Sequence, residues 1–102
     1  MSEIKHHHFE WDSEKATSNV HKHGVSFEEA ATVFDDPFFV AFRSQRHSID
    51  ERRYVIIGMS SQECLLAVAF TEPERIRIIS ARKLTSRERR NYEKKKKELS
   101  NE

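Results

Sequence analysis

The sequence predicts an α+β fold in which N-terminal helices precede an antiparallel β-meander and a C-terminal helix follows the sheet. Three observations support this class: helix-capping residues recur before position 37, β-branched and aromatic runs begin at Phe38, and a basic segment rich in helix formers begins at Thr85. A chain of 102 residues is the length of one small domain. We therefore expect a single domain over residues 1–102, with its core at about 9–93 and a basic tail at 94–102.

Two helices are predicted in the N-terminal third. The first covers residues 12–22 and ends at Gly24, which supplies the left-handed conformation that follows many helices. The second begins at Ser26, which with Glu29 has the S-x-x-E spacing of a capping box. The proline at position 37 then stops it.

Strands are predicted from short runs of β-branched and aromatic residues. A short strand near Phe9 precedes the helices. The four main strands are Phe38 to Phe42, Arg53 to Met59, Cys64 to Thr71, and Arg75 to Arg82. The last two connections are too short for a crossover helix, so the last three strands form an antiparallel meander. The nearly continuous apolar run CLLAVAF predicts a central strand covered on both faces.

Charge is distributed unevenly along the chain. Residues 75–102 contain eleven Lys or Arg and four Glu, whereas residues 1–74 contain seven basic and thirteen acidic residues. The overall charge of +1 therefore conceals a basic C-terminal part able to attract phosphate groups. Alternation in the last strand places Ile76 and Ile78 on one face and Arg75 and Arg77 on the other. For Lys94 to Lys97 taken alone, a solvated helix or frayed tail is the favoured interpretation.

Several classes of function are not supported. The sequence has no apolar run of the about 20 residues that a membrane helix needs, and its polar start does not resemble a secretory signal, so we expect a cytoplasmic protein without membrane contact. The single Cys64 excludes an internal disulfide. His21 and His23 do not have the spacing of a metal site, and His6 to His8 would bind metal only adventitiously. We expect neither a metal nor a cofactor.

Phosphate chemistry without a metal is better supported. Cleavage of RNA by a ribose 2′-hydroxyl requires charge stabilisation at the scissile phosphate and groups that accept and donate a proton. Arginine suits the first task because its planar fork binds two phosphate oxygens and stays charged. The candidates for proton transfer are His47, His23, Lys83 and Tyr92, and Tyr92 could instead stack on a base.

Each of these residues also has a structural interpretation. Arg82 and Lys83 could be ordinary charges at the end of a strand, and His47 could be a loop residue. Tyr92 could anchor the C-terminal helix to the sheet. A protein that binds nucleic acid or a protein partner without cutting anything would show the same charge distribution, so it remains an alternative function.

Three segments together resemble a known family. They are FEWDSEKATSNVHKHGVSFEEAATVFDDP, HSIDERRYVIIGMS and RIRIISARKLTSRERRNYE, covering about residues 9–93 in this order. They resemble the BrnT toxins of BrnT/BrnA type II toxin–antitoxin systems, and KHGVSFEEA and RIISARK are the most specific parts. The resemblance implies a RelE-like ribonuclease fold, with helices first, an antiparallel sheet next and a terminal helix last. It also implies a toxin that cleaves RNA and inhibits translation.

The resemblance further implies a site and a partner. Its catalytic residues would be Arg53, Arg82, Lys83 and Tyr92, and we add His47 as a catalytic candidate for proton transfer. The residues expected to bind RNA are Lys22, His23, Arg52, Arg75, Arg77, Arg87 and Arg90. The expected partner is a BrnA-type antitoxin in a complex of two toxins and two antitoxins, and DNA would be contacted only indirectly, through the antitoxin.

Overall fold

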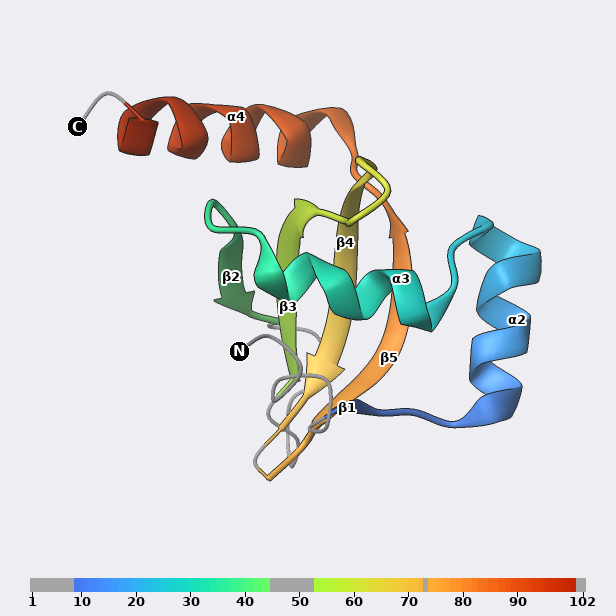
Figure 1. Ribbon diagram of the computed structural model, residues 1–102. Helices are drawn as coiled ribbons and strands as arrows, with labels where there is room; N and C mark the ends of the chain where they lie inside the picture. Colours follow the sequence, from blue (N-terminus) through green and yellow to red (C-terminus); the bar gives the residue numbers. More distant parts are fainter. Residues whose placement is uncertain (1–8, 45–52, 73, 101–102) are drawn as a thin grey trace.

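The structure, a computed structural model, describes residues 9–44, 53–72 and 74–100. Its elements, in chain order, are β1 (Phe9–Glu10), α2 (Ser13–His23), α3 (Phe27–Thr32), a 3-10 turn η1 (Val33–Asp35), β2 (Val40–Arg43), β3 (Arg53–Met59), β4 (Leu65–Thr71), β5 (Ile76–Lys83) and α4 (Ser86–Ser100). The α+β class predicted from the sequence is confirmed (Figure 1).

The helix ends form through the local contacts that the sequence predicts. The Asp12 carboxylate accepts the N–H of Lys15 at 3.1 Å and begins α2. Gly24 ends this helix with φ at 70°, a left-handed conformation that glycine adopts without the steric cost of a Cβ. The Ser26 hydroxyl accepts the N–H of Glu29 at 3.0 Å at the start of α3. The caps at Asp12, Gly24 and Ser26 are confirmed, whereas the Glu29 carboxylate accepts the hydroxyl of Ser60 at 2.7 Å and does not complete the capping box.

The strands form one five-stranded sheet in the order β1-β5-β4-β3-β2. Strands β2 to β5 are an antiparallel meander with β4 in the middle, as the apolar run CLLAVAF predicts. The short strand β1 lies parallel to β5, with Phe9 opposite Ile76. The predicted antiparallel meander is confirmed, and β1 makes the sheet mixed at one edge.

Helices pack on both faces of the sheet. On one face α2 and α3 cover the larger core, whose centre is formed by Phe27, Ile56, Leu66 and Val68; α3 lies across this face in Figure 1. On the other face a smaller cluster of Ile57, Ala67 and Tyr92 attaches α4. Because this second cluster is small, part of that face is left without a helix over it.

A buried amide completes the first core. Asn19 on α2 exposes 6% of its surface, and its side chain both donates to the carbonyl of Ala81 at 2.8 Å and accepts the N–H of Ala81 at 3.1 Å. The amide thus satisfies both backbone groups of Ala81 in β5, as a neighbouring strand would do. It also donates to the carbonyl of Val25 at 2.9 Å, so that α2, β5 and the segment between α2 and α3 are held together.

Candidate functional site

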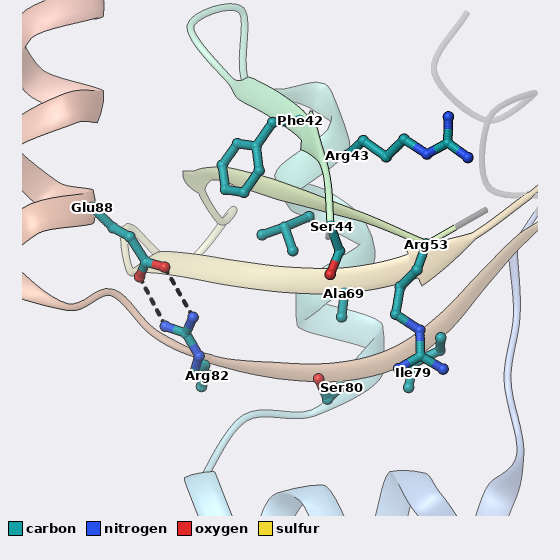
Figure 2. A pocket seen from close by; sticks show the side chains of 10 residues that line it. Phe42, Arg43, Ser44, Arg53, Ala69, Ile79, Ser80, Arg82 and Glu88 are labelled. Atoms are coloured by element: carbon teal, nitrogen blue, oxygen red, sulfur yellow. Dashed lines mark hydrogen bonds and ion pairs between the residues drawn. The ribbon is translucent and has the colours of Figure 1, made fainter. Parts of the chain in front are cut away.

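A cleft of about 730 Å³ lies on the face of the sheet that α4 covers only in part. It is lined by Phe42, Arg43, Ser44, Arg53, Val55, Ala69, Ile79, Ser80, Arg82 and Glu88 (Figure 2). Ala69 and Ser80 are opposite each other in β4 and β5, and their small side chains leave room above the strands. The volume lies within the range of about 300–1,000 Å³ usual for ligand sites.

A bulge in β5 directs Arg82 into this cleft. Ile78 is opposite Phe70 and Ser80 is opposite Ala69, so Ile79 is an extra residue that has no pairing partner in β4. An extra residue reverses the alternation of side chains beyond it. Arg82 consequently lies on the cleft face, whereas unbroken alternation from Ile76 and Ile78 would place it in the larger core.

Glu88 holds the guanidinium of Arg82 in a fixed orientation. Two of its nitrogens donate to the two carboxylate oxygens of Glu88 at 2.8 and 2.9 Å, and Nη1 also donates to the carbonyl of Lys83 at 3.1 Å. These bonds engage three of the five N–H groups of an arginine, which leaves two for a ligand. The hydrogen bonds from Arg82 lower the pKa of Glu88 to about 2, and those to Glu88 raise the pKa of Arg82.

Arg53 reaches the same cleft from another strand. It is the first residue of β3 and lies opposite Thr71 of β4, while Arg82 lies opposite Ala67. Two strand spacings and a four-residue offset place their Cα atoms roughly 16 Å apart. In Figure 2 the side chain of Arg53 crosses the floor of the cleft toward Ile79, and Arg82 stands at the opposite end. The two arginines therefore flank the floor made by Ala69 and Ser80.

Tyr92 does not reach the cleft, which corrects its prediction as a catalytic or base-stacking residue. It exposes 2% of its surface, its ring packs with Ile57 and Ala67, and its hydroxyl donates to Asp36 at 2.6 Å. Burial, and then the Asp36 carboxylate, raise its pKa. This is the anchoring role that the sequence left open for Tyr92.

The other predicted basic residues are spread over the surface. Lys83 is exposed and follows Arg82 in the strand, so alternation turns it away from the cleft. Lys22 and His23 are exposed at the end of α2, and Arg87 and Arg90 are exposed on α4. None of these residues lines the cleft.

Arg75 and Arg77 lie near the opposite end of the sheet from Arg82. Together with Glu10, Glu72 and Glu74 they line a separate shallow pocket, in which Arg77 donates to Glu10 at 3.2 Å. Because acidic side chains surround them, these arginines do not extend the positive charge of the cleft.

Two predicted residues, His47 and Arg52, lie outside the described residues. The segment that contains them joins Ser44 to Arg53, and both of these residues line the cleft. Within the described part of the chain, no three His, Cys, Asp or Glu side chains gather in the way a metal ion would need.

Sequence reasoning identified only Arg53 and Arg82 among the residues that line the cleft, and Phe42, Ser80 and Glu88 are the most informative of those it missed. The sequence assigns Phe42 only to a strand and Glu88 only to a helix cap. A signal existed for Phe42, since it falls two residues after Val40 in an alternating strand. The position of Ser80 depends on the bulge, which no residue pattern marks.

The fold and the cleft define a small α+β protein whose cleft is flanked by two arginines. Over residues 11–88 the chain matches the family described as "Ribonuclease toxin, BrnT, of type II toxin-antitoxin system". The chain belongs to the BrnT toxin family, as its sequence motifs predict. A type II system pairs such a toxin with an antitoxin, so the family implies an antitoxin partner.

A solved structure shows the same fold. The 1.1 Å crystal structure of the Brucella abortus ribonuclease toxin, BrnT, is similar to this chain with a TM-score of 0.57 and 22% sequence identity. The match covers 74% of this chain and 94% of the Brucella chain. A search of curated proteins found no significant match. None of the helices in the described residues combines the length and apolar character that crossing a membrane requires.

Proposed function

We propose that this protein is a metal-independent endoribonuclease toxin that cleaves RNA and thereby inhibits translation. One observation supports it above all: Arg53 and Arg82, from two different strands, flank a single cleft. Guanidinium groups at both ends of a cleft can neutralise a bound phosphodiester and stabilise the charge that develops during its cleavage. Arg82 in particular is already oriented by Glu88 and needs no rearrangement to bind.

Glu88 is not the proposed proton acceptor, although its carboxylate lines the cleft. Among the described residues that line the cleft, Glu88 is the one carboxylate, and a pKa of about 2 makes it a weak base at neutral pH. It stays ionised and positions Arg82. We keep His47 as the proposed proton carrier because its segment connects two cleft residues, Ser44 and Arg53.

A cleavage assay on purified protein in EDTA tests the proposal. RNA should be cut in the chelator, and Arg82→Ala and Arg53→Ala should each lower the rate by at least about tenfold, since each removes a charge from the scissile phosphate. Arg82→Lys should recover little activity because a single ammonium cannot reproduce the planar fork. Thermal melts of each variant show whether it is still folded.

Lys15→Ala is the matched control. Lys15 is exposed on α2, away from the cleft, so this variant loses one positive charge without touching the site and should cleave at the wild-type rate. Cleavage that EDTA abolishes would contradict metal independence. Undiminished cleavage by both folded arginine variants would show that the cleft is not the active site.

The second candidate is a module that binds RNA or a protein partner without cleavage. The pairing of Arg82 with Glu88 favours it, because a guanidinium held in this way can bind a phosphate or a protein carboxylate without any catalytic step. Intact RNA after long incubation, combined with salt-dependent binding, would select this function.

We also propose that a BrnA-type antitoxin neutralises the toxin in a complex of two copies of each protein. Covering the arginine cleft would block the phosphate site directly. Expression of the toxin alone should stop growth, and co-expression with the antitoxin should restore it. Arg82→Ala should abolish the arrest. The mass of the purified complex in solution measures its stoichiometry, and a mass that does not equal two toxins plus two antitoxins would contradict the proposed assembly.

A further inference from the structure

Phe42 is a solvent-exposed apolar side chain that lines the cleft. It exposes 45% of its surface on β2, opposite Val55 of β3, and both residues line the cleft. In Figure 2 its ring stands above the floor, between the Arg82–Glu88 pair and Ser44. Other aromatic residues, such as Phe34 and Phe70, pack in the larger core, where their rings are 5.0 Å apart. The exposed ring of Phe42 instead lines the cleft that Arg53 and Arg82 flank.

The combination of Phe42 with two arginines matches the needs of one type of ligand. Proteins that bind single-stranded nucleic acid have two kinds of contact. Cationic side chains lie along the phosphates, and aromatic rings stack on the bases. A base in a duplex is already stacked on both sides and paired, so its faces are not open to a side chain. Every base has a π-face, and a ring of this kind therefore selects unpaired bases without selecting a sequence.

We propose that Phe42 forms a base-stacking subsite beside the phosphate site and thereby restricts the protein to single-stranded RNA. This inference rests on the proposed function, because it places the base next to the phosphate that Arg53 and Arg82 hold. The nucleotide would lie with its phosphate between the arginines and its base against the ring. The Ser80 hydroxyl, which lines the same cleft, would contact its sugar or base edge.

Binding of a 2′-O-methyl RNA oligonucleotide tests the subsite apart from cleavage, since this probe lacks the attacking hydroxyl. Phe42→Ala should weaken binding of the single strand by about 5- to 100-fold and leave the weaker binding of a duplex of the same sequence unchanged. Phe42→Trp should keep the affinity, and its indole fluorescence should be quenched as the single strand binds.

Phe39→Ala is the matched control. Phe39 exposes 44% of its surface, belongs to the same stretch of chain and does not line the cleft, so its loss should leave the affinity for the oligonucleotide unchanged. An equal loss in both phenylalanine variants would overturn the subsite, as would unchanged binding by Phe42→Ala or the absence of any binding by wild type.

The outcomes also separate this inference from its alternatives. If Phe42→Ala binds the oligonucleotide normally but escapes the antitoxin, Phe42 is a protein contact and the stacking subsite is wrong. If the single strand binds through Phe42 but natural RNA is never cut, the subsite stands and the proposed ribonuclease activity fails.

Discussion

Asp36 shows how one buried carboxylate connects three parts of the chain. It exposes 9% of its surface and accepts the N–H groups of Phe38 at 2.9 Å and Met59 at 2.8 Å, as well as the hydroxyl of Tyr92 at 2.6 Å. Gly58 leaves room for it, since a Cβ there would lie 3.1 Å from an oxygen of Asp36. Through these bonds the turn before β2, the end of β3 and α4 keep fixed positions, and α4 in turn carries Glu88.

Tyr92→Phe should therefore act on stability and not on chemistry. The change removes one hydrogen bond to a buried carboxylate, which should lower the free energy of unfolding by about 1–3 kcal/mol. Because the pKa of Tyr92 is raised in the folded state, its contribution is complete below about pH 10 and is lost as the pH rises further. Thermal melts measure the destabilisation, and the cleavage rate per folded molecule should equal that of wild type.

Tyr54→Phe provides the comparison for this prediction. Tyr54 is half-buried on the opposite face of the sheet, where its ring stacks on Phe70 at 5.6 Å, so removing its hydroxyl should change stability little. A Tyr92→Phe protein with the wild-type melting temperature but no activity would contradict this prediction and show that Tyr92 takes part in catalysis.

Local signals explain which elements were predictable from the sequence. The caps at Asp12, Ser26 and Thr85 depend on residues three positions apart, and the apolar character of β4 results from its own residues. Contacts between distant segments leave no such signal. The parallel pairing of Phe9 with Ile76 is one example, and the amide of Asn19 serving β5 is another.

The candidate site was predictable only in part for the same reason. Arg53 and Arg82 were expected to share a site, but the bulge at Ile79 that directs Arg82 into the cleft has no sequence signature. The family resemblance implied a catalytic Tyr92, but the residue pattern left its anchoring role open, and only the packing of α4 on Ile57 and Ala67 decides between the two. Lys83 was grouped with Arg82 because the two are adjacent in sequence, whereas adjacent residues of a strand point to opposite faces.

The start of α4 is coupled to the site through Glu88. Its carboxylate accepts the N–H of Thr85 at 2.9 Å while the Thr85 hydroxyl accepts the N–H of Glu88 at 3.2 Å, which is a complete capping box. The same carboxylate binds Arg82 through two hydrogen bonds. Movement of the first turn of α4 would therefore move the guanidinium.

Glu88→Gln should reveal this coupling through pH. The pKa of Glu88 is lowered from 4.5 to about 2 in the folded state, so its ionised form stabilises the fold fully above about pH 4.5, and this contribution is lost as the pH falls toward 2. Wild type should therefore melt at a higher temperature than Glu88→Gln at pH 7, and the difference should shrink as the pH approaches 2. Melting curves across this pH range measure it.

Glu93→Gln is the control on the same helix. Its carboxylate lies 3.9 Å from Arg89, with both side chains more than half exposed, and such surface pairs contribute little. This variant should follow the wild-type melting profile. A constant difference between wild type and Glu88→Gln at every pH would show that the ion pair with Arg82 does not stabilise the fold.

The molecule as a whole is polarised by its C-terminal helix. In Figure 1 α4 crosses one end of the sheet and its C-terminal turns extend beyond it. Lys96 lies over the ring of Phe38, 5.5 Å from its centre, whereas Lys94, Lys95 and Lys97 are exposed to solvent. Exposed charges outside a cleft act over distance, so they increase the rate at which a polyanion arrives without taking part in its cleavage.

Replacing Lys94, Lys95 and Lys97 together with alanine should consequently slow RNA association and leave catalysis intact. Alanine preserves the helix, and keeping Lys96 preserves the contact with Phe38. At low salt the apparent KM should rise while kcat stays unchanged. The difference from wild type should disappear in about 1 M salt, where the Debye length is about 3 Å. Stopped-flow association rates and cleavage kinetics across a salt series measure both quantities. A fall in kcat, or a loss of affinity that persists at high salt, would place the end of α4 in direct contact with the RNA and extend the site beyond the arginine cleft.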